Sequence, residues 1–295
     1  MKILLTGKNG QVGFELRRSL AVLGEIYAID IADCDLSNAN AIRQIITNYQ
    51  PDVIVNPAAY TAVDKAENDI ANATAINANA PSLLAEMAET LGAVLVHYST
   101  DYVFDGEKLA AYTETDAPNP QNVYGTTKLA GELAIQNNCQ RHVILRTSWV
   151  VGAHGNNFAK TVLQLATERN TLKIVADQIG VPTSASLLAD LTAHLVNKSQ
   201  QNIGKFPYGL YHATADGETN WYEYACYVIK KAQIVGKTIS VTPDSIHPIS
   251  TVESPTPAKR PLNSRLDTTK LRKTFGLHLP NWQDSLDHIL DQILL

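Results

Sequence analysis

Residues 2–13 read KILLTGKNGQVG, in which a short apolar run leads directly into three equally spaced glycines. We expect Gly7 to allow a sharp turn after a β-strand, Gly10 to let backbone N–H groups approach a diphosphate, and Gly13 to let the next helix pack closely on the strand. Glycine also serves ordinary tight turns, so the following residues must distinguish the two interpretations. The stretch predicts the first strand, turn and helix of a dinucleotide-binding domain.

The residues after the turn favour the dinucleotide interpretation. Val12 and Leu16 begin an apolar pattern with helical spacing, and IYAID (residues 26–30) then gives a second strand that ends in Asp30. An acid about 20 residues beyond the middle glycine can accept hydrogen bonds from the ribose hydroxyls of NAD. The alternative is that Asp30 only caps the end of the strand.

Two charged residues oppose each other in the choice of cofactor. Asp30 favours the free 2′-hydroxyl of NADH and repels the 2′-phosphate of NADPH, whereas Lys8 in the glycine turn can reach and neutralise that phosphate. Lys8 is alternatively a solvated loop cation. We expect both NADH and NADPH to be accepted, with NADH modestly preferred.

Apolar, strand-like segments alternate with helical patterns along the first half of the chain. The strand-like segments are ILLT, IYAID, DVIVNPAA, VLVHYST and HVILRTSWVVG, with helical spacing between them in AIRQIITNY and APSLLAEMAETLG. This alternation predicts a Rossmann fold, which is an α/β architecture with a doubly wound parallel sheet. Such sheets bind ligands at the carboxyl ends of their strands, where Gly7, Asp30, residues 58–61, Ser99 and Thr100 fall.

The composition of the chain changes after about residue 150, where a glycine-rich loop and then Pro-, Ser- and Thr-rich stretches follow. We expect residues 1–150 to form the NAD(P)-binding domain and residues 151–295 to form mainly a smaller C-terminal substrate-binding domain. We also expect the chain to re-enter the first domain near residues 184–200 and 225–245.

Composition and charge argue against several classes of protein. The 295 residues carry a formal net charge of −5 with no basic run, so we expect no nucleic-acid partner. The N-terminal apolar run ends at Leu5, and no segment approaches about 18 uninterrupted apolar residues, so we expect no membrane partner and a soluble, cytoplasmic protein. The isolated Cys34, Cys139 and Cys226 indicate neither a disulfide framework nor a zinc site.

Three side chains in the middle of the chain indicate the reduction of a ketone. Tyr124 and Lys128 stand four residues apart in YGTTK, so on a helix they project from one face, and Thr100 ends the fourth predicted strand. A cation beside a phenol lowers the phenol pKa from its usual value of about 10, which eases proton transfer near neutral pH. The alternative is a half-buried tyrosine beside a solvated lysine.

Eight motifs, spread nearly from end to end, carry a more specific signal. They are GKNGQVG, NPAAYTAVDKAE, HYSTDYVFDG, NVYGTTKLAGE, RTSWVVG, GNNFAKT, DQIGVPT and RPLNSRLD. Together they resemble the dTDP-4-dehydrorhamnose reductase family of extended short-chain dehydrogenases. The resemblance implies NAD(P)H-dependent reduction of the C4 ketone of dTDP-4-dehydro-β-L-rhamnose to dTDP-L-rhamnose, the last step in making this sugar donor.

The resemblance also implies roles for individual residues. Thr100 takes the place of the catalytic Ser or Thr, Tyr124 that of the proton donor, and Lys128 that of its partner, which also holds the nicotinamide ribose. Hydrogen bonding of the ketone oxygen by Thr100 fits the chemistry independently. The positions that match cofactor contacts are Gln11, Val12, Asp30, Asp35, Leu36, Ala59, Tyr60, Thr61 and Tyr98, and those that match substrate contacts are Asp101 and Trp149.

Further candidates for binding the nucleotide sugar follow from chemistry. Arg260 and Arg265 offer forked donors to a diphosphate, although a surface salt bridge is the commoner fate of an arginine. Asn156 and Asn157 either bond the sugar or base or cap the helix that follows them. Trp149 either shapes the deoxyhexose pocket or is an interdomain aromatic residue.

One position departs from the family pattern. Some members hold a divalent cation at a dimer interface through two acids, of which Glu15 matches the first, but Ser186 stands where the second would be. We therefore predict no metal site, and a monomer and a homodimer both stay open. Two other functions also stay open: an NAD-dependent nucleotide-sugar epimerase, and a non-catalytic protein like the regulatory subunit of methionine adenosyltransferase.

Overall fold

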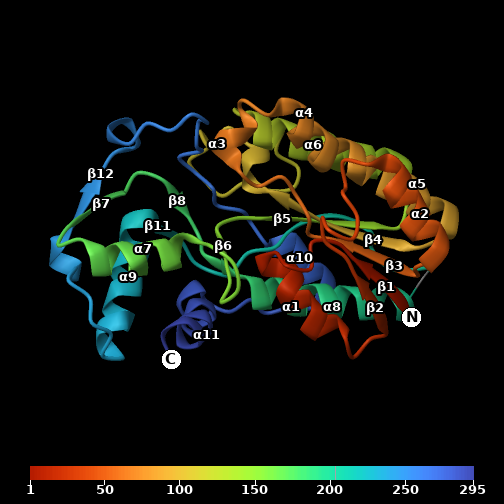
Figure 1. Cartoon of the computed structure of the whole chain (residues 1–295). Helices are drawn as coiled ribbons and strands as arrows, with labels where there is room; N and C mark the ends of the chain where they lie inside the picture. Colours follow the sequence, from red (N-terminus) through yellow and green to blue (C-terminus); the bar gives the residue numbers. More distant parts are fainter. Residues whose placement is uncertain (203) are drawn as a thin grey trace.

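The centre of the protein is a parallel sheet of six strands. The computed structural model describes residues 1–202 and 204–295, and Figure 1 shows the sheet between two layers of helices. The strands follow the order β10-β5-β4-β3-β1-β2, and each neighbouring pair is parallel. Their bounds are Lys2–Leu5 (β1), Glu25–Ala28 (β2), Val53–Asn56 (β3), Val94–Thr100 (β4), His142–Thr147 (β5) and Gly209–His212 (β10). This order confirms the predicted doubly wound α/β fold.

Helices cover both faces of the sheet. Helices α1, α8 and α10 pack on one face, and α2, α5 and α6 pack on the other (Figure 1). Their bounds are Gln11–Leu20 (α1), Ala39–Tyr49 (α2), Ala80–Leu91 (α5), Val123–Asn138 (α6), Ala185–Gln201 (α8) and Thr269–Phe275 (α10). In the described part of the chain, none of the helices has the length and apolar character of a membrane span.

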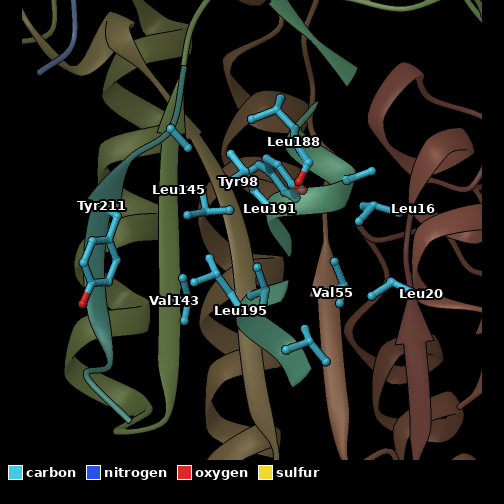
Figure 2. Close-up of a cluster of buried hydrophobic side chains, with 14 of the residues drawn as sticks. Leu16, Leu20, Val55, Tyr98, Val143, Leu145, Leu188, Leu191, Leu195 and Tyr211 are labelled. Carbon is cyan, nitrogen blue, oxygen red and sulfur yellow. Dashed lines mark hydrogen bonds between the residues drawn. The ribbon is translucent and has the colours of Figure 1, made fainter. Parts of the chain in front are cut away.

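An apolar core between the sheet and helices α1, α8 and α10 fixes α1 against the sheet. Burial of each leucine-sized side chain stabilises the fold by roughly 1.5–3 kcal/mol, so this layer holds the N-terminus of α1 at the carboxyl ends of the strands. Figure 2 shows the packing of Leu16 and Leu20 of α1, of Leu188, Leu191 and Leu195 of α8, and of the strand residues Val55, Tyr98, Val143, Leu145 and Tyr211.

A second apolar cluster is built on three further helices, at the left of Figure 1. The helices are Phe158–Glu168 (α7), Trp221–Ile234 (α9) and Trp282–Leu294 (α11). Short strand pairs join them: Val150–Val151 (β6) with Thr183–Ser184 (β9), Leu172–Val175 (β7) with Ile246–Ile249 (β12), and Ile179–Gly180 (β8) with Thr219–Asn220 (β11). The remaining short elements are Val63–Ala66 (α3), Ile70–Thr74 (α4), a π-helical turn at Ala75–Asn79, and 3₁₀ turns at Asp101–Val103, Pro243–Ser245 and Thr251–Glu253.

Parts of the C-terminal half pack with the central sheet and helix α1. Helix α8 packs on α1, β10 pairs with β5, and Leu271 of α10 lies in the same core. In contrast, Ala225 and Val228 of α9 lie in the second cluster. The sequence predicts instead that residues 225–245 return to the first domain. We therefore propose a nucleotide-binding domain of residues 1–150 completed by α8, β10 and α10, with the second cluster as the smaller domain.

Candidate active site

A cavity of about 490 Å³ opens at the carboxyl ends of the central strands. Because parallel strands end at one edge of a sheet, turns that are distant in sequence meet here. The lining residues are Gly7, Asn9, Gly10, Gln11, Val12, Gly13, Asp30, Pro57, Ala58, Ala59, Thr61, Tyr98, Ser99, Tyr124, Lys128, Thr147, Val150, Gly155 and Asn156. Most of the predicted cofactor residues, with Tyr124 and Lys128, therefore share one cavity.

A second cavity of about 240 Å³ adjoins the first, with Gly7 and Asp30 in the walls of both. Asp35 and Leu36 line it as predicted for cofactor contacts, and Ile76 of the π-helical turn adds an apolar wall that the sequence did not indicate. We call the two adjoining cavities together the trough, whose lining includes Tyr124 in the first cavity and Leu36 in the second.

The glycine turn has the geometry that the sequence predicts. Gly7 has a φ of +60°, which favours glycine, and a Cβ added at Gly13 would lie 1.9 Å from the carbonyl oxygen of Gly7. Helix α1 begins after Gly10, and no side chain caps its first turn. Its first N–H groups can therefore bind a diphosphate.

Asp30 and Lys8 have fixed partners beside this turn. Asp30 accepts a 2.8 Å hydrogen bond from the backbone N–H of Asn9, while the ammonium of Lys8 lies 2.7 Å from a carboxylate oxygen of Asp33. The same oxygen of Asp33 accepts from the backbone N–H of Asp30. The hydrogen bond from Lys8 holds the pKa of Asp33 below its usual value. Asp33 is thus a second acid at this position, and Lys8 is paired with it.

Tyr124 and Thr100 lie together at the other end of the trough. Burial raises the pKa of the Tyr124 phenol, and the nearby hydroxyl of Thr100 acts in the opposite direction. The predicted lowering of this pKa is therefore wrong for the protein as it stands. Thr100 itself donates to a carboxylate oxygen of Asp101 at 3.0 Å and accepts from the backbone N–H of Tyr102 at 3.1 Å. The edge of Tyr102 packs on the ring of Tyr124.

Lys128 is buried, not solvated. Its Nζ donates to the carbonyl oxygen of Tyr98 at 2.5 Å and lies 3.2 Å from Nε2 of His97. Burial lowers the pKa of Lys128 to about 8, although Glu132, one turn further along α6, acts in the opposite direction. Lys128 can therefore change its charge near physiological pH.

Asp101 is the most unusual acid of the site. It is 3% exposed, and burial raises its pKa to about 6. Among the described residues, its Oδ2 has no hydrogen-bond partner, and neither do the buried hydroxyls of Ser99 and Thr147 in the cavity wall. The hydroxyls of Ser99 and Thr147 line the main cavity and are available to a bound ligand, whereas Asp101 is outside the cavity lining and faces the hydroxyl of Ser264.

Two predicted cofactor contacts use their hydroxyls elsewhere. The phenol of Tyr98 lies 2.6 Å from the hydroxyl of Thr192 in the core shown in Figure 2, so this end of the side chain points away from the trough. The phenol of Tyr60 donates to Asp69 at 2.8 Å, and only its neighbours Ala59 and Thr61 line the main cavity.

Trp149 belongs to an aromatic pair. Its ring stacks on Trp221 with the centroids 3.7 Å apart, and its φ of 46° is in the left-handed region. A Cβ at Gly180 would lie 2.6 Å from the Trp149 ring, so only glycine leaves room for it. Trp221 was not predicted, because no motif marks it.

The loop before α7 is tied to the glycine turn. Asn157 accepts from the backbone N–H of Lys160, which makes it the helix cap that the sequence offered as an alternative. Its amide also donates to Gln11 at 3.0 Å. Asn156 instead lines the main cavity and is free to contact a ligand there.

The two predicted arginines are both in ion pairs. Arg260 lies 2.7 Å from Asp64 and donates to the phenol of Tyr102 at 3.0 Å, whereas Arg265 lies 2.9 Å from Glu218. Tyr102 therefore contacts both Arg260 and Tyr124, which links Arg260 to the site. Arg265 fits the salt-bridge alternative.

The positions compared with a metal site have other contacts. Glu15 pairs with Arg18, and the hydroxyl of Ser186 donates to that of Ser184. Residues 1–202 and 204–295 contain no group of three or more His, Cys, Asp or Glu side chains that could hold a metal ion.

Polar residues inside buried strands are among the residues that the sequence analysis missed. His97 interrupts the apolar pattern of β4, and Asn56 ends the apolar run of β3. A polar residue in a strand that is buried on both faces needs a partner, so these positions carried a signal that could have been used.

Comparisons with known proteins find relatives over the whole chain. The model of a family described as the RmlD substrate binding domain matches residues 1–295. A dTDP-4-dehydrorhamnose reductase of Salmonella typhimurium is 48% identical over 297 residues, which cover 99% of this chain and 98% of the relative. The crystal structure of such a reductase from Clostridium acetobutylicum is 38% identical, with a TM-score of 0.90 and full coverage of both chains. A third, from Bacillus anthracis in complex with NADP, is 34% identical, with a TM-score of 0.88 and 99% coverage of each chain.

Proposed function

The chain belongs to the RmlD substrate binding domain family, and from this membership we propose that it reduces the C4 ketone of dTDP-4-dehydro-β-L-rhamnose to give dTDP-L-rhamnose. The observation that carries the proposal is that Tyr124 and Lys128 line the same cavity as the glycine turn. This supports the proposal, because a ketone reductase needs its proton donor and its dinucleotide at the same edge of the sheet.

The trough fits a nicotinamide dinucleotide. The uncapped N-terminus of α1 suits the diphosphate, Asp30 lies beside the ribose position, and Leu36 and Ile76 suit a flat base. When bound, the cofactor supplies the hydride that the ketone carbon receives. Ser99 and Thr147 offer unpartnered hydroxyls at the Tyr124 end of the trough.

The residues around Tyr124 handle the proton. Since burial keeps its pKa high, the phenol holds its proton until charge develops on the ketone oxygen, and it then donates that proton. Thr100 hydrogen-bonds the same oxygen once its hydroxyl turns away from Asp101, and Lys128 supplies positive charge below a pH of about 8. Lys128 would also hold the nicotinamide ribose, since it lines the cavity beside Ser99.

We further propose that both cofactors are accepted and that NADH is modestly preferred. The carboxylates of Asp30 and Asp33 would both repel a 2′-phosphate bound beside the glycine turn, and Lys8 is already paired with Asp33. A 2′-phosphate must therefore compete with Asp33 for Lys8, which reduces the benefit that this lysine gives to NADPH.

The substrate would lie between Tyr124 and the second cluster. Asp101, Trp149 and Asn156 are its proposed contacts, and Arg260 is the arginine better placed for the diphosphate because it bonds Tyr102, which packs on Tyr124. The cytoplasm is the proposed place of action, and a monomer and a homodimer are equally compatible with this function.

A stoichiometric assay tests the reaction. The protein is incubated with a dTDP-4-keto-6-deoxy sugar and NADH or NADPH, and cofactor oxidation is followed beside product formation. One cofactor oxidised per alcohol formed supports the proposal. Redox-neutral conversion would instead indicate an epimerase, and tight protein binding without turnover would indicate a regulatory subunit.

A further inference from the structure

A row of buried hydrogen-bonding groups leads through the sheet to Lys128. The hydroxyl of Thr6 lies 2.6 Å from Oδ1 of Asn56, Nδ2 of Asn56 lies 3.0 Å from Nδ1 of His97, and Nε2 of His97 lies 3.2 Å from Nζ of Lys128. The four side chains come from the residue after β1, from the end of β3, from β4 and from α6, and none is more than 2% exposed. Water cannot replace a missing partner here, so donors and acceptors must match along the row.

In one consistent arrangement Lys128 is a neutral amine. The amide nitrogen of Asn56 donates to Nδ1 of His97, so the single proton of a neutral imidazole sits on Nε2. That N–H points at Nζ of Lys128. Nζ can accept this hydrogen bond only as a neutral amine, because an ammonium has no free lone pair.

The second consistent arrangement has Lys128 as an ammonium. Nζ then donates to Nε2 of His97, and the imidazole proton must sit on Nδ1. Asn56 turns its amide so that Oδ1 accepts from Nδ1 and Nδ2 donates to the hydroxyl of Thr6. Donors and acceptors again match along the row. The two arrangements differ in the charge on Lys128, the tautomer of His97, the direction of the amide and the role of the Thr6 hydroxyl, which donates in the first and accepts in the second.

The charges around the row keep the imidazole neutral. Burial, together with the charge of Lys128, holds the pKa of His97 well below its usual value. Helix α6 presents Tyr124 and Glu132 near Lys128, and Glu132 is paired with Arg146 of β5. Thus Lys128 is the group of the row that changes charge near neutral pH, while His97 changes only its tautomer.

We propose that His97 is a positioning residue for Lys128, and that the tautomer of its neutral imidazole follows the charge on Lys128. The catalytic meaning of this inference rests on the proposed reductase function. His97 keeps Nζ hydrogen-bonded in both charge states, so neither state leaves Nζ or a nitrogen of the imidazole unpaired, and Nζ stays in one position.

The first test is independent of turnover. The full chain, labelled with ¹⁵N-histidine, is studied by NMR with and without NADPH, and the His97 signals are assigned by their loss in His97→Gln. At about pH 6.5 we expect the proton on Nδ1, and at about pH 9.5 on Nε2. An imidazolium or an Nε2 proton at the lower pH, or one tautomer at both pH values, would overturn the proposal.

The second test compares two amides at position 97. The glutamine of His97→Gln can place its oxygen near the former Nε2 and still accept from Lys128, whereas the shorter asparagine of His97→Asn can replace only the Nδ1 side. We expect kcat within about threefold of wild type for Gln, and roughly 10- to 100-fold lower for Asn. In the Asn variant, the basic limb of the kcat profile should also move about 0.5–1 pH unit lower, because the ammonium loses an acceptor.

The outcomes separate this inference from the proposed function. If the wild-type protein oxidises no cofactor with the ketosugar, the reductase assignment fails, and the NMR experiment alone decides the role of His97. If the wild type turns over and His97→Asn matches it in kcat and in its pH profile, His97 does not position Lys128. NADPH affinity, measured by titration calorimetry, shows whether a variant still folds and binds.

Discussion

Lys8 and Asp33 form an ion pair of 2.7 Å at the rim of the glycine turn, beside Asp30. Both side chains are about one-third exposed, so solvent screens the pair and a ligand can compete for either partner. Asp33 therefore already neutralises part of the positive charge of Lys8 before a cofactor binds. Cofactor selectivity should depend on three residues, not on the two that the sequence indicated.

Substitutions at these residues should move the selectivity in opposite directions. Asp30→Ala and Asp33→Asn each remove a negative charge and should raise the ratio of kcat/KM for NADPH to that for NADH, whereas Lys8→Ala should lower it. Each change should be about tenfold or less, because the groups are exposed. The ratio is used because Asp30 also bonds Asn9, so its loss weakens the binding of both cofactors.

The salt concentration provides the control. The changes should shrink between low and high salt if they are electrostatic. If Asp33→Asn and Lys8→Ala move the ratio in the same direction, the pair does not act as described.

Tyr124→Phe should remove turnover without removing cofactor binding. The substitution takes away the transferable proton and leaves the ring that packs on Tyr102. General acid catalysis contributes roughly 10² to 10⁴ in rate, and kcat should fall by that factor. Cofactor affinity, measured by fluorescence titration, should stay near the wild-type value. A variant with more than about half of wild-type kcat would show that another group donates the proton.

The buried ion pair between Glu132 and Arg146 should be important for stability. The carboxylate of Glu132 accepts two hydrogen bonds, of 2.8 and 2.6 Å, from the guanidinium of Arg146. Both side chains are at most 4% exposed. Glu132→Gln leaves a buried arginine without a countercharge, which costs about 3–5 kcal/mol. The midpoint of urea unfolding should fall accordingly.

The matched control is the surface pair of Arg43 and Glu86, 3.9 Å apart with both side chains about half exposed. Glu86→Gln should change the free energy of unfolding by about 0.5 kcal/mol or less. Equal midpoints for the two variants would mean that the buried pair is not needed.

The fold and the convergence of the candidate site residues could be predicted because their signals are local. The glycine turn, the alternation of apolar strands and helices, and the spacing of Tyr124 and Lys128 depend on residues that are neighbours in sequence, and the structure places them in one cavity. Strand β10 and the pairing of α8 with α1 depend on contacts over long sequence separations, so they were only partly foreseen.

Electrostatics could not be predicted from spacing alone. Four residues of separation place Tyr124 and Lys128 on one helix face, but burial, which raises one pKa and lowers the other, depends on all the elements packed around them. The partners of Lys128 and Lys8, His97 and Asp33, are likewise set by tertiary structure.

Asp101 should reveal a conflict between stability and binding. Burial raises its pKa from 3.8 to about 6, so the folded chain holds this proton up to about pH 6, whereas the unfolded chain loses it near 3.8. The folded state therefore binds more protons between these values, and the free energy of unfolding falls as pH rises through that window, by roughly 3 kcal/mol in total. Asp101→Asn removes this titration. Its urea midpoint should exceed that of wild type at about pH 7 and approach it at about pH 4, while its KM for the ketosugar rises.

Asp105→Asn is the control, and its urea midpoint should be lower than that of wild type at about pH 7. The hydrogen bond from Tyr112 holds the pKa of Asp105 below its usual value, so the ionised carboxylate stabilises the folded chain. A wild-type midpoint that rises with pH relative to Asp101→Asn would show that this carboxyl is ionised in the folded protein at little cost.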